Sequence, residues 1–542
     1  MDRRNFATIW EGMADSFGDR VVITQGDQRL TWREWDDEAS RLAGWLEAQG
    51  VGEGDRVGVV AYNVPEVFVI MLAGFKLRAV ATAFNYRYLA PELIEVLTDC
   101  GAPVVFFHGS LGPELDLARE QLPGVQHWVE LDDGDPPSPW AVPYASTLDS
   151  PPAARRERSA EDHTIQYTGG TTGRPKGVVW THRQIIDTVS IMSYLPLGIG
   201  MPDTVEEMVD IARRQVEAGA APVYLVSAPL MHGSGLWSCF AQLQVGGQLI
   251  LLESRSMDPA EILTAIQQHH VRSIVVIGDA FARPLVEELE RAADAGQPYD
   301  LSSIEGISSS GVAFSAPYKR RFLAHATKAV LLEAVGGSEG GPIGTSITWP
   351  GTEPTDTAVF TASDNTVLID EGHVVPWGTE GTFLFGYKGP LPSGYLDDPD
   401  KTAATFPTID GVRYLVSGDM GSIDADGTLR FIGRGNTCIN TGGEKVFPAE
   451  VEEVVKVHPD VVDCLVVGVP NERFGSAVAA LVSLRDGASL DLDGLVAHCK
   501  THLSGYKQPR HLVLVDAVRR SVAGKADYRW ATELAMDQLA DR

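Results

Sequence analysis

Short apolar runs alternate with helical segments through the first half of the chain, and this alternation limits the fold more than any other feature. Residues 55–62, 80–84 and 104–107 are short runs rich in β-branched and aromatic side chains, which is typical of buried strands. Thr31 and Glu34 form a capping-box pattern that opens one intervening helix. Strands that alternate with helices predict an α/β fold whose parallel sheet is covered on both faces.

Length, charge and cysteine content narrow the class of protein. A chain of 542 residues is expected to divide into more than one domain. The formal net charge of −29 argues against binding to nucleic acid or to anionic lipid. Five cysteines without a Cys-x-x-Cys pair predict neither a disulfide framework nor a zinc site, as expected for a cytoplasmic protein. The apolar run at residues 67–75 is too short for an integral membrane segment, and the N-terminus lacks a signal-peptide core.

Residues 167–177 (Tyr-Thr-Gly-Gly-Thr-Thr-Gly-Arg-Pro-Lys-Gly) suit an anionic ligand. Glycines let the backbone come close to a ligand, and successive amides with the hydroxyls of Thr171 and Thr172 suit phosphate oxygens. Lys176 adds a positive charge. The stretch is not a Walker A loop, because Pro175 stands where that pattern has a glycine. A flexible Gly- and Thr-rich linker is the alternative, and the rigid proline and the apolar residues that follow disfavour it.

Further polar motifs follow predicted strands in chain order. Ligands of open α/β sheets bind beyond the carboxyl ends of the strands, so side chains at these positions are candidates for a site. The motifs are His232 beside two glycines after the strand at 223–228, the small-residue turn at 308–315, Val-Gly-Gly-Ser-Glu at 335–339, Tyr-Leu-Val-Ser-Gly-Asp at 414–419 and Phe-Ile-Gly-Arg at 431–434. Alone, each would also be compatible with an ordinary turn or a packed core position.

Taken in order, the loop and these motifs resemble the adenylate-forming superfamily, which includes acyl-CoA synthetases, luciferases and the adenylation domains of nonribosomal synthetases. The resemblance extends from about Thr8 to Trp530. It is closest to actinobacterial acyl-CoA ligases for fatty acids and steroid side-chain acids. The segment at 438–448 (Cys-Ile-Asn-Thr-Gly-Gly-Glu-Lys-Val-Phe-Pro) is similar to acyl-CoA synthetases and unlike luciferases.

The resemblance implies two domains. Residues 1–435 would form a large N-terminal α/β domain of several subdomains, with the ATP and acyl sites. Residues 436–542 would form a small, mobile C-terminal α+β lid domain, and Asn436 aligns with the family's hinge residue. Pro448 suits the first turn of a helix in this lid domain.

The resemblance also assigns roles to single residues. The residues implied to be catalytic are Thr171, Lys176, His232, Glu339 and Lys525. Of these, Glu339 and Thr171 would hold Mg²⁺ carried by ATP, because Mg²⁺ prefers hard oxygen ligands shared with phosphates. The residues implied to bind ATP or CoA are Thr168, Gly169, Gly170, Thr172, Gly173, Gly311, Val312, Val335, Gly336, Ser338, Asp419, Arg434, Gly442, Gly443 and Glu444. Val335 departs from the family, which usually places a tyrosine against the adenine.

The implied function is that of an ATP-dependent carboxylic acid–CoA ligase, an AMP-forming acid–thiol ligase. A carboxylate would attack the α-phosphorus of ATP, and the CoA thiol would then displace AMP to give a thioester. Transfer to a separate carrier protein or an amine is the alternative enzyme, and a nucleotide-binding protein without catalysis is the alternative of another class. Met231, Leu236, Trp237 and Phe240 favour an apolar acid. A homodimer and a role for the polar insertion at 195–222 are left open.

Overall fold

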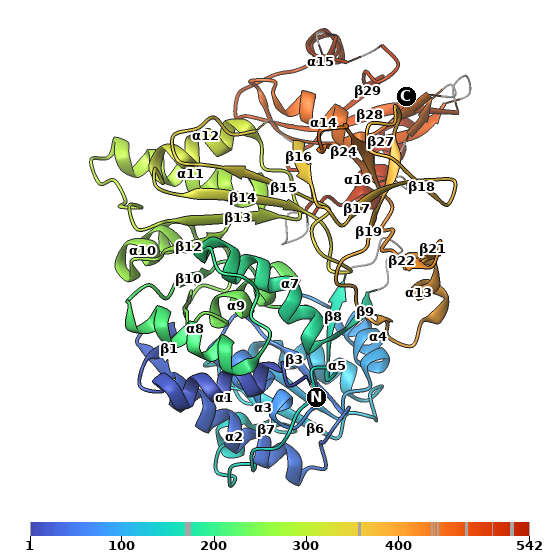
Figure 1. Ribbon diagram of the computed structural model, residues 1–542. Coiled ribbons are helices and arrows are strands. Elements are labelled where there is room, and N and C mark those ends of the chain that lie inside the picture. The colour runs from blue at the N-terminus through green and yellow to red at the C-terminus, as the bar shows by residue number, and fades with distance from the viewer. Residues whose placement is uncertain are drawn as a thin grey trace.

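The predicted α/β architecture is present in the structure, a computed structural model that describes residues 2–168, 175–355, 359–434, 437, 439–441, 444–471, 475–500, 502–503, 505–520 and 525–540. A large N-terminal α/β domain carries a smaller C-terminal domain, which is coloured orange to red at the top of Figure 1. Within the described ranges, no helix combines the length and apolar character needed to cross a bilayer.

The first sheet of the large domain is parallel throughout. Its strand order is β4-β3-β5-β6-β7, and every neighbouring pair is parallel. The strands are β3 (Arg56–Val60), β4 (Val80–Ala83), β5 (Val104–His108), β6 (His127–Leu131) and β7 (Val142–Pro143). The helices here are α2 (Trp32–Ala48), α3 (Pro65–Lys76), α4 (Ala90–Cys100), α5 (Gly112–Arg119) and α6 (Tyr144–Thr147). The predicted capping box is confirmed, because Thr31 and Glu34 exchange side-chain and backbone hydrogen bonds at the start of α2.

A second, 14-stranded sheet runs through the large domain, and its first part is mostly parallel. Strands β14, β13, β12, β10, β11 and β1 are neighbours in that order and run parallel, whereas the edge strand β2 is antiparallel. Their bounds are β1 (Val21–Gln25), β2 (Gln28–Thr31), β10 (Val223–Val226), β11 (Gln248–Leu251), β12 (Ser273–Val275), β13 (Gly306–Ser310) and β14 (Val330–Val335). The associated helices are α9 (Gly233–Leu243), α10 (Pro259–His269), α11 (Gly278–Asp294) and α12 (Ala316–His325).

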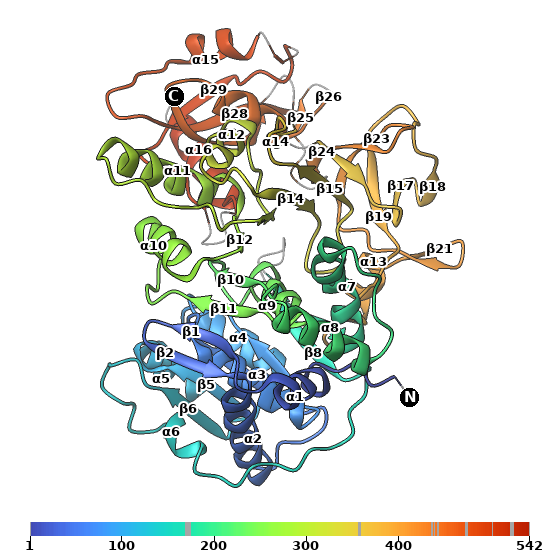
Figure 2. The ribbon, with the colours of Figure 1, turned by 60° about the vertical axis from the view of Figure 1, so that its left-hand side comes forward.

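The rest of this sheet is antiparallel and curls away from the parallel part, as Figure 2 shows. Its strands are β15 (Gly344–Thr348), β16 (Val359–Ala362), β17 (Thr366–Asp370), β18 (His373–Val375), β19 (Phe383–Tyr387), β23 (Asp419–Ile423) and β24 (Thr428–Arg434). One prediction needs adjustment here. Residues 308–310, predicted to begin a turn, still belong to β13, and the turn begins at Gly311.

The parallel arrangement that the alternation predicts does not extend to the strand that precedes the Gly- and Thr-rich loop. Strand β8 (His163–Thr168) pairs antiparallel with β9 (Lys176–Thr181), from His163 opposite Thr181 to Thr168 opposite Lys176. β9 also pairs antiparallel with β20 (Gly394–Tyr395). A short apolar run has the same composition in a parallel and an antiparallel strand, so its pairing partner was not visible in the sequence.

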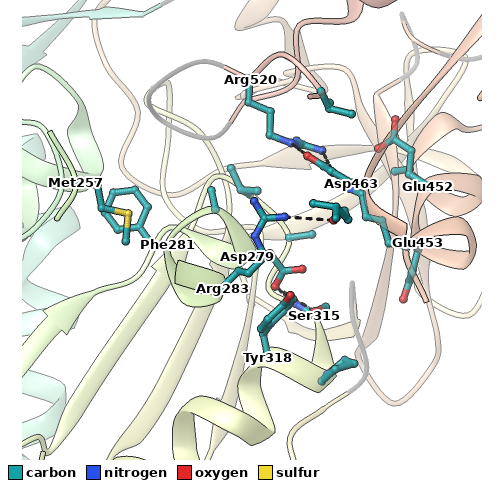
Figure 3. Close-up of a pocket in the computed structure, with 18 of the residues that line it drawn as sticks. Met257, Asp279, Phe281, Arg283, Ser315, Tyr318, Glu452, Glu453, Asp463 and Arg520 are labelled. Atoms are coloured by element: carbon teal, nitrogen blue, oxygen red, sulfur yellow. Dashed lines mark hydrogen bonds and ion pairs between the residues drawn. The ribbon is translucent and has the colours of Figure 1, made fainter. Parts of the chain in front are cut away.

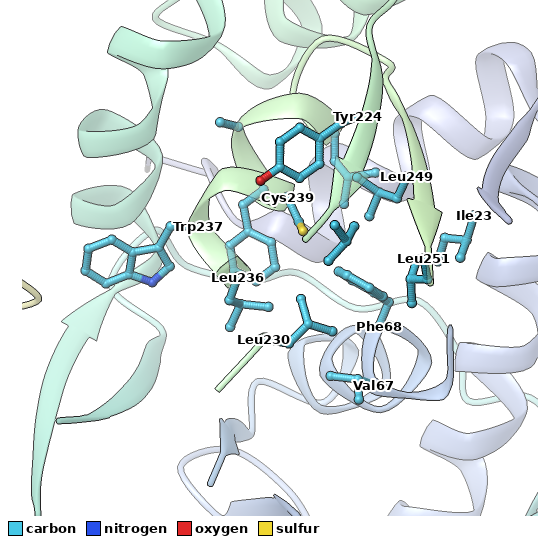
Figure 4. Packing of buried hydrophobic residues seen from close by; sticks show 14 of the residues in the cluster. Ile23, Val67, Phe68, Tyr224, Leu230, Leu236, Trp237, Cys239, Leu249 and Leu251 are labelled. Carbon is cyan, nitrogen blue, oxygen red and sulfur yellow. The ribbon is translucent and has the colours of Figure 1, made fainter. Parts of the chain in front are cut away.

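The large domain has an extensive apolar core between its helices and the two sheets. Figure 4 shows Phe68 of α3, Tyr224 of β10 and Leu236 of α9 packed together. Helix α8 (Val205–Glu217), which lies within the 195–222 insertion, buries Met208 and Ile211 against α1 (Phe6–Phe17). Helix α7 (His182–Tyr194) packs on α9. The insertion therefore contributes packing to the core.

The C-terminal domain is built on a five-stranded sheet with the order β26-β25-β28-β27, in which β29 also pairs with β28. The long hairpin of β27 (Val461–Asn471) and β28 (Gly475–Leu484) forms its centre. The remaining elements are α14 (Pro448–Lys456), α15 (Leu492–Cys499), α16 (Tyr528–Ala540), β25 (Ile439–Thr441), β26 (Glu444–Val446) and β29 (His511–Leu514). This is the small α+β domain that the sequence predicts.

Candidate active site

Loops from three parallel strands meet at one edge of the 14-stranded sheet. β10 ends at Val226, β13 at Ser310 and β14 at Val335. Because the carboxyl ends of parallel strands lie at the same edge, the following loops bring His232, Gly311 and Glu339 to a common region. Gly311 has a φ of 83° and no atom within 4 Å of the position where a Cβ would stand. A ligand can therefore approach the backbone closely at this residue.

Glu339 links this edge to the β8–β9 hairpin. The Glu339 carboxylate accepts a hydrogen bond from Tyr395 Oη at 3.2 Å and a longer one from Thr168 Oγ1 at 3.5 Å. Thr168 is the last residue of β8, and the indole N–H of Trp180 in β9 donates to the carbonyl of Ser338 at 3.1 Å. The start of the phosphate-binding motif and the predicted magnesium carboxylate are thus neighbours, although 171 residues separate them in the chain.

Lys176 forms an ion pair that the sequence did not predict. Its Nζ lies 2.5 Å from Asp398 Oδ2. Asp398 is the N-cap of α13 (Pro399–Thr405) and accepts from the backbone N–H of Lys401 at 2.9 Å. The hydrogen bond from Lys176 holds the pKa of Asp398 below its usual range. The ammonium is therefore held at the end of the hairpin, and phosphate oxygens would have to share it or take it from Asp398.

The loop that carries His232 is fixed by two side-chain amides, the buried Gln166 and the half-buried Asn63. Gln166 Nε2 donates to the carbonyl of Met231 at 2.6 Å. The Asn63 side chain donates to Ala228 O at 3.0 Å and accepts from Leu230 N at 2.9 Å. His232 itself is the N-cap residue of α9.

The environment of His232 shows that groups from both domains reach this region. Burial lowers the pKa of His232 to about 4, and the positive charges of Lys525 and Arg87 contribute to the shift. The imidazole is therefore neutral at physiological pH. Lys525 belongs to the C-terminal domain, so in this arrangement its ammonium lies close enough to His232 to act on it electrostatically.

Asp419 and Arg434 stand opposite each other on neighbouring strands. Asp419 opens β23, is 5% exposed and accepts a hydrogen bond from Ser417 Oγ at 2.6 Å. In the β23–β24 register, the Cα partner of Asp419 is Arg434. Val335 packs against the apolar cluster of the antiparallel part, and Val312 lines the crevice described below.

Several predicted site residues lie outside the described residues. They are Gly169, Gly170, Thr171, Thr172, Gly173, Asn436, Gly442 and Gly443. The side chains of Arg434 and Glu444 are likewise outside the description, whereas their backbones belong to β24 and β26. Among the described residues, no group of three or more His, Cys, Asp or Glu side chains could hold a metal ion alone. The described cysteines Cys100, Cys239, Cys464 and Cys499 are free and buried.

A crevice of about 1260 Å³ lies between the two domains. In Figure 3 its walls carry Asp279, Arg283 and Tyr318 of the large domain and Asp463 and Arg520 of the C-terminal domain. The crevice reaches the edge of the sheet, because residues that follow β10 and β13 also line it; these are Ser227, Pro229, Val312 and Ala313. It therefore connects the domain interface with the region of His232.

Three residues of the site were missed in the sequence. Tyr395 and Asp398 belong to a Gly-Tyr-x-x-x-Pro-x-x-Thr segment at 394–402, and Trp180 follows the Lys-Gly end of the loop. The Asp-Pro pair at 398–399 is a helix-start signal and would have located α13. Nothing in the local pattern shows that Tyr395 would meet Glu339 or that Asp398 would meet Lys176, because these contacts depend on the fold.

Family models agree with this arrangement of two domains around one site. The model described as AMP-binding enzyme matches residues 10–396, and the AMP-binding enzyme C-terminal domain matches residues 450–525. The chain belongs to the AMP-binding enzyme family, as its motifs indicated.

Two relatives of this chain are named as CoA ligases. The chain is 37% identical to a medium/long-chain-fatty-acid–CoA/3-oxocholest-4-en-26-oate–CoA ligase of Mycolicibacterium smegmatis, over 99% of this chain and 97% of the relative. It is 36% identical to a 3-oxocholest-4-en-26-oate–CoA ligase of Rhodococcus rhodochrous, over 98% of this chain and 95% of the relative. The expectation of an acid–thiol ligase that uses ATP and CoA is confirmed at the level of the family.

Solved structures share the fold over the whole chain. The anthranilate CoA ligase AuaEII, in complex with anthranoyl-AMP, superposes with a TM-score of 0.81 at 21% identity and covers 99% of this chain and 98% of its own. ATP-bound MatB from Rhodopseudomonas palustris gives a TM-score of 0.79 at 23% identity, with 98% and 99% covered. At these sequence identities the similarity to the two solved structures shows a shared fold only.

Proposed function

We propose that the protein is an ATP-dependent ligase that joins an apolar carboxylic acid to CoA through an acyl-adenylate. The observation that carries this proposal is that Glu339, hydrogen-bonded to Thr168, lies at the same sheet edge as His232. Lys525 of the other domain acts electrostatically on His232 there. The acid's carboxylate oxygen would attack the α-phosphorus of ATP and release pyrophosphate. The CoA sulfur would then attack the acyl carbon, give up its proton and release AMP.

Positioning and charge neutralisation account for most of such a reaction. Lys176, Thr171 and Thr172 would hold the β,γ-phosphates, and Asp419 with Arg434 would hold the ribose. Lys525 would lie between the carboxylate and the α-phosphate, where two anions have to approach each other. The neutral His232 would border the acyl carboxylate without adding a charge.

Magnesium fits the residues around Glu339. A single carboxylate with nearby hydroxyl groups is too small a set to bind the ion alone, but it suits Mg²⁺ that ATP phosphates already hold. Bound in this way, the ion would neutralise charge on the phosphates. Glu339 would orient it, with Tyr395 and Thr168 keeping the carboxylate in place.

The acid is proposed to be a medium- or long-chain fatty acid or a steroid side-chain acid. The names of the two relatives above favour these classes. The segment after β10 is also apolar, with Met231, Leu236 and Phe240 buried beside His232. CoA is proposed to enter through the interdomain crevice. The boundary between residues 435 and 436, a cytoplasmic location and a homodimer stay predictions.

A panel of acids tests the function. The purified chain is incubated with MgATP and acetate, an amino acid, octanoate, dodecanoate, palmitate or 3-oxocholest-4-en-26-oate, and pyrophosphate and thioester are measured with and without CoA. Pyrophosphate release and thioester formation only with the apolar acids are expected. Turnover of acetate or the amino acid alone would overturn the apolar class. Acid-dependent pyrophosphate without CoA consumption would favour transfer to a carrier protein or an amine, and no acid-dependent release would favour a binding protein.

A further inference from the structure

Lys525 lies beside a pairing of two short segments, residues 519–520 and 526–527, which we call the base. Arg520 and Ala526 form an antiparallel bridge, and Asp527 N donates to the carbonyl of Arg519 at 3.2 Å. Lys525 directly precedes the second segment, so its backbone direction depends on how this base is held. Side chains on both sides of the base attach it to the rest of the domain.

The first attachment is the ion pair of Arg520 with Asp463. Arg520 Nε lies 2.6 Å from Asp463 Oδ2, and Nη2 lies 2.8 Å from Oδ1, so the contact is bidentate. Only about a fifth of either side chain is exposed, 19% for Arg520 and 20% for Asp463. Burial raises the pKa of Asp463, but the bonds from Arg520 and the charge of Lys456 at 3.5 Å more than offset this and lower it. A planar two-point contact of this kind fixes orientation as well as distance.

The second attachment lies on the other side of Lys525. Tyr528, the first residue of α16, lies close to the buried Glu452 of α14, and burial together with the Glu452 carboxylate raises the pKa of its phenol. Glu452 also accepts from the backbone N–H of Val466 in β27 at 2.9 Å. Residues five before and three after Lys525 are therefore both tied to the same β27–α14 unit.

The same unit contacts the large domain. Arg283 Nη1 of α11 donates to the carbonyl of Val462 at 3.3 Å, directly beside Asp463. Figure 3 shows Arg520 paired with Asp463 on the C-terminal side of the crevice and Arg283 of the large domain below them. The chain of contacts therefore runs from α11 through β27 to the base that carries Lys525.

We propose that Asp463 is a positioning residue for adenylate formation, because its carboxylate holds Arg520 and with it the base beside Lys525. Arg283 completes the arrangement by holding the adjacent carbonyl against the large domain. This inference rests on the proposed role of Lys525. In this role Asp463 acts through the placement of the lysine ammonium and not by binding the acid or ATP.

The expected effect is confined to one half-reaction. A displacement of a reacting group by about 1 Å can cost roughly 10²-fold in rate, so Asp463→Asn should lower kcat for acid-dependent pyrophosphate release by about 10- to 100-fold. KM for ATP should change less than about twofold, because Asp463 contacts no part of the nucleotide site. Thioester formation from a supplied acyl-adenylate and CoA should stay near the wild-type rate, since Lys525 is proposed to serve the first step.

The experiment compares Asp463→Asn, Arg520→Lys, Lys525→Ala and wild type in both half-reactions, with the panel acid that wild type uses best. Arg520→Lys keeps the charge but loses the two-point contact, so its first-step rate should fall between wild type and Asp463→Asn. Arg529→Met is the matched control, because Arg529 pairs only with Glu533 on the exposed face of α16 among the ion pairs described there. It should leave both rates unchanged.

Each outcome supports or overturns the inference. Equal loss in both half-reactions, or no loss in Asp463→Asn while Lys525→Ala is impaired, overturns the positioning role and leaves the function intact. If wild type shows no acid-dependent pyrophosphate release, the proposed function is wrong instead. If Lys525→Ala is unimpaired, the proposed role of Lys525 is wrong instead. If thermal unfolding shows that Asp463→Asn does not fold, Arg520→Lys decides, and a wild-type first-step rate in that folded variant overturns the proposal.

Discussion

At the scale of single residues, the candidate site depends on hydrogen bonds between groups that are far apart in the chain. The Glu339 carboxylate accepts hydrogen bonds from Tyr395 of β20 and Thr168 of β8. Each hydrogen bond contributes little free energy alone. A carboxylate held by two hydroxyls nevertheless loses less conformational entropy when it binds a metal ion. Removing one hydroxyl should therefore lower kcat/KM for MgATP.

Tyr395→Phe removes the hydroxyl and keeps the ring, which packs near Phe406. Losing a hydrogen bond to a carboxylate costs about 1–2 kcal/mol, so kcat/KM for MgATP in pyrophosphate release should fall roughly 5- to 30-fold. Tyr299→Phe is the matched control, since Tyr299 Oη donates to Glu288 on α11 at 2.9 Å, away from the site. A loss as large in the control, or none in Tyr395→Phe, would contradict a role for this hydroxyl.

Glu38 of α2 makes stability depend on pH. Burial, followed by the nearby charges of Glu66, Glu34 and Asp37, raises the pKa of Glu38 from 4.5 to about 7. A raised carboxyl pKa means that the folded state binds the proton more tightly, so this contribution to stability is present below pH 4.5 and is lost as the pH rises through 7. The shift corresponds to about 3 kcal/mol at most, and partial exposure reduces it to about 1 kcal/mol.

Glu38→Gln should therefore raise the free energy of unfolding by about 1 kcal/mol at pH 8.5 and leave it nearly unchanged at pH 5. Urea unfolding at the two pH values measures the difference. Glu287→Gln, at an exposed position of α11, is the control and should show no such dependence. A stabilisation by Glu38→Gln that is the same at both pH values would contradict the titration.

At the scale of elements, local sequence signals predicted the positions of helices and strands well. They did not show which strands pair with each other. The helix after Thr31 and the strands around Val104 and Val330 follow from periodicity, caps and β-branched runs. The antiparallel pairing of β8 with β9 and the end of β13 at Ser310 depend on which segment lies alongside, which no local pattern records. The same reason explains why Lys176 was recognised and its partner Asp398 was not.

The capping box of α2 offers a direct test of a local signal. Thr31→Ala removes the hydroxyl that accepts from Glu34 N at 3.2 Å, and should lower the free energy of unfolding by about 1 kcal/mol. Thr31→Ser keeps the cap and should cost only a few tenths of a kcal/mol. Urea unfolding of both variants measures the difference, and equal destabilisation would show that the methyl group, not the cap, matters.

At the scale of the whole molecule, the site is complete only when the two domains lie as they do here. Lys525 is near His232, while Arg283 holds Val462 across the crevice. The electrostatic interaction and the hydrogen bond both link the C-terminal domain to the large one. A measurement on His232 therefore reports whether the domains adopt this arrangement in solution.

Lys525→Ala should raise the pKa of His232, because the ammonium is one of the charges that lower it. NMR titration of histidine-labelled protein, with His232→Gln used to assign the resonance, measures the shift. Arg529→Met serves again as the control for a lost charge in the same domain. An unchanged His232 pKa in Lys525→Ala would mean that the free protein holds its domains apart.

The pairing of β1 with β11 has a consequence for how the chain is made. Ile23 lies beside Leu249 in a parallel register, so the first strand has no neighbour on that side until β11 has been synthesised. At about 5–20 residues per second the ribosome needs roughly 10–45 s to add the intervening segment. During this time Val22 and Ile23, which are buried on opposite faces of β1 in the folded protein, lack these neighbours, and sheets with such distant partners form slowly. Chaperone binding to the nascent N-terminal hairpin is therefore expected to govern the yield of folded protein more than any later step.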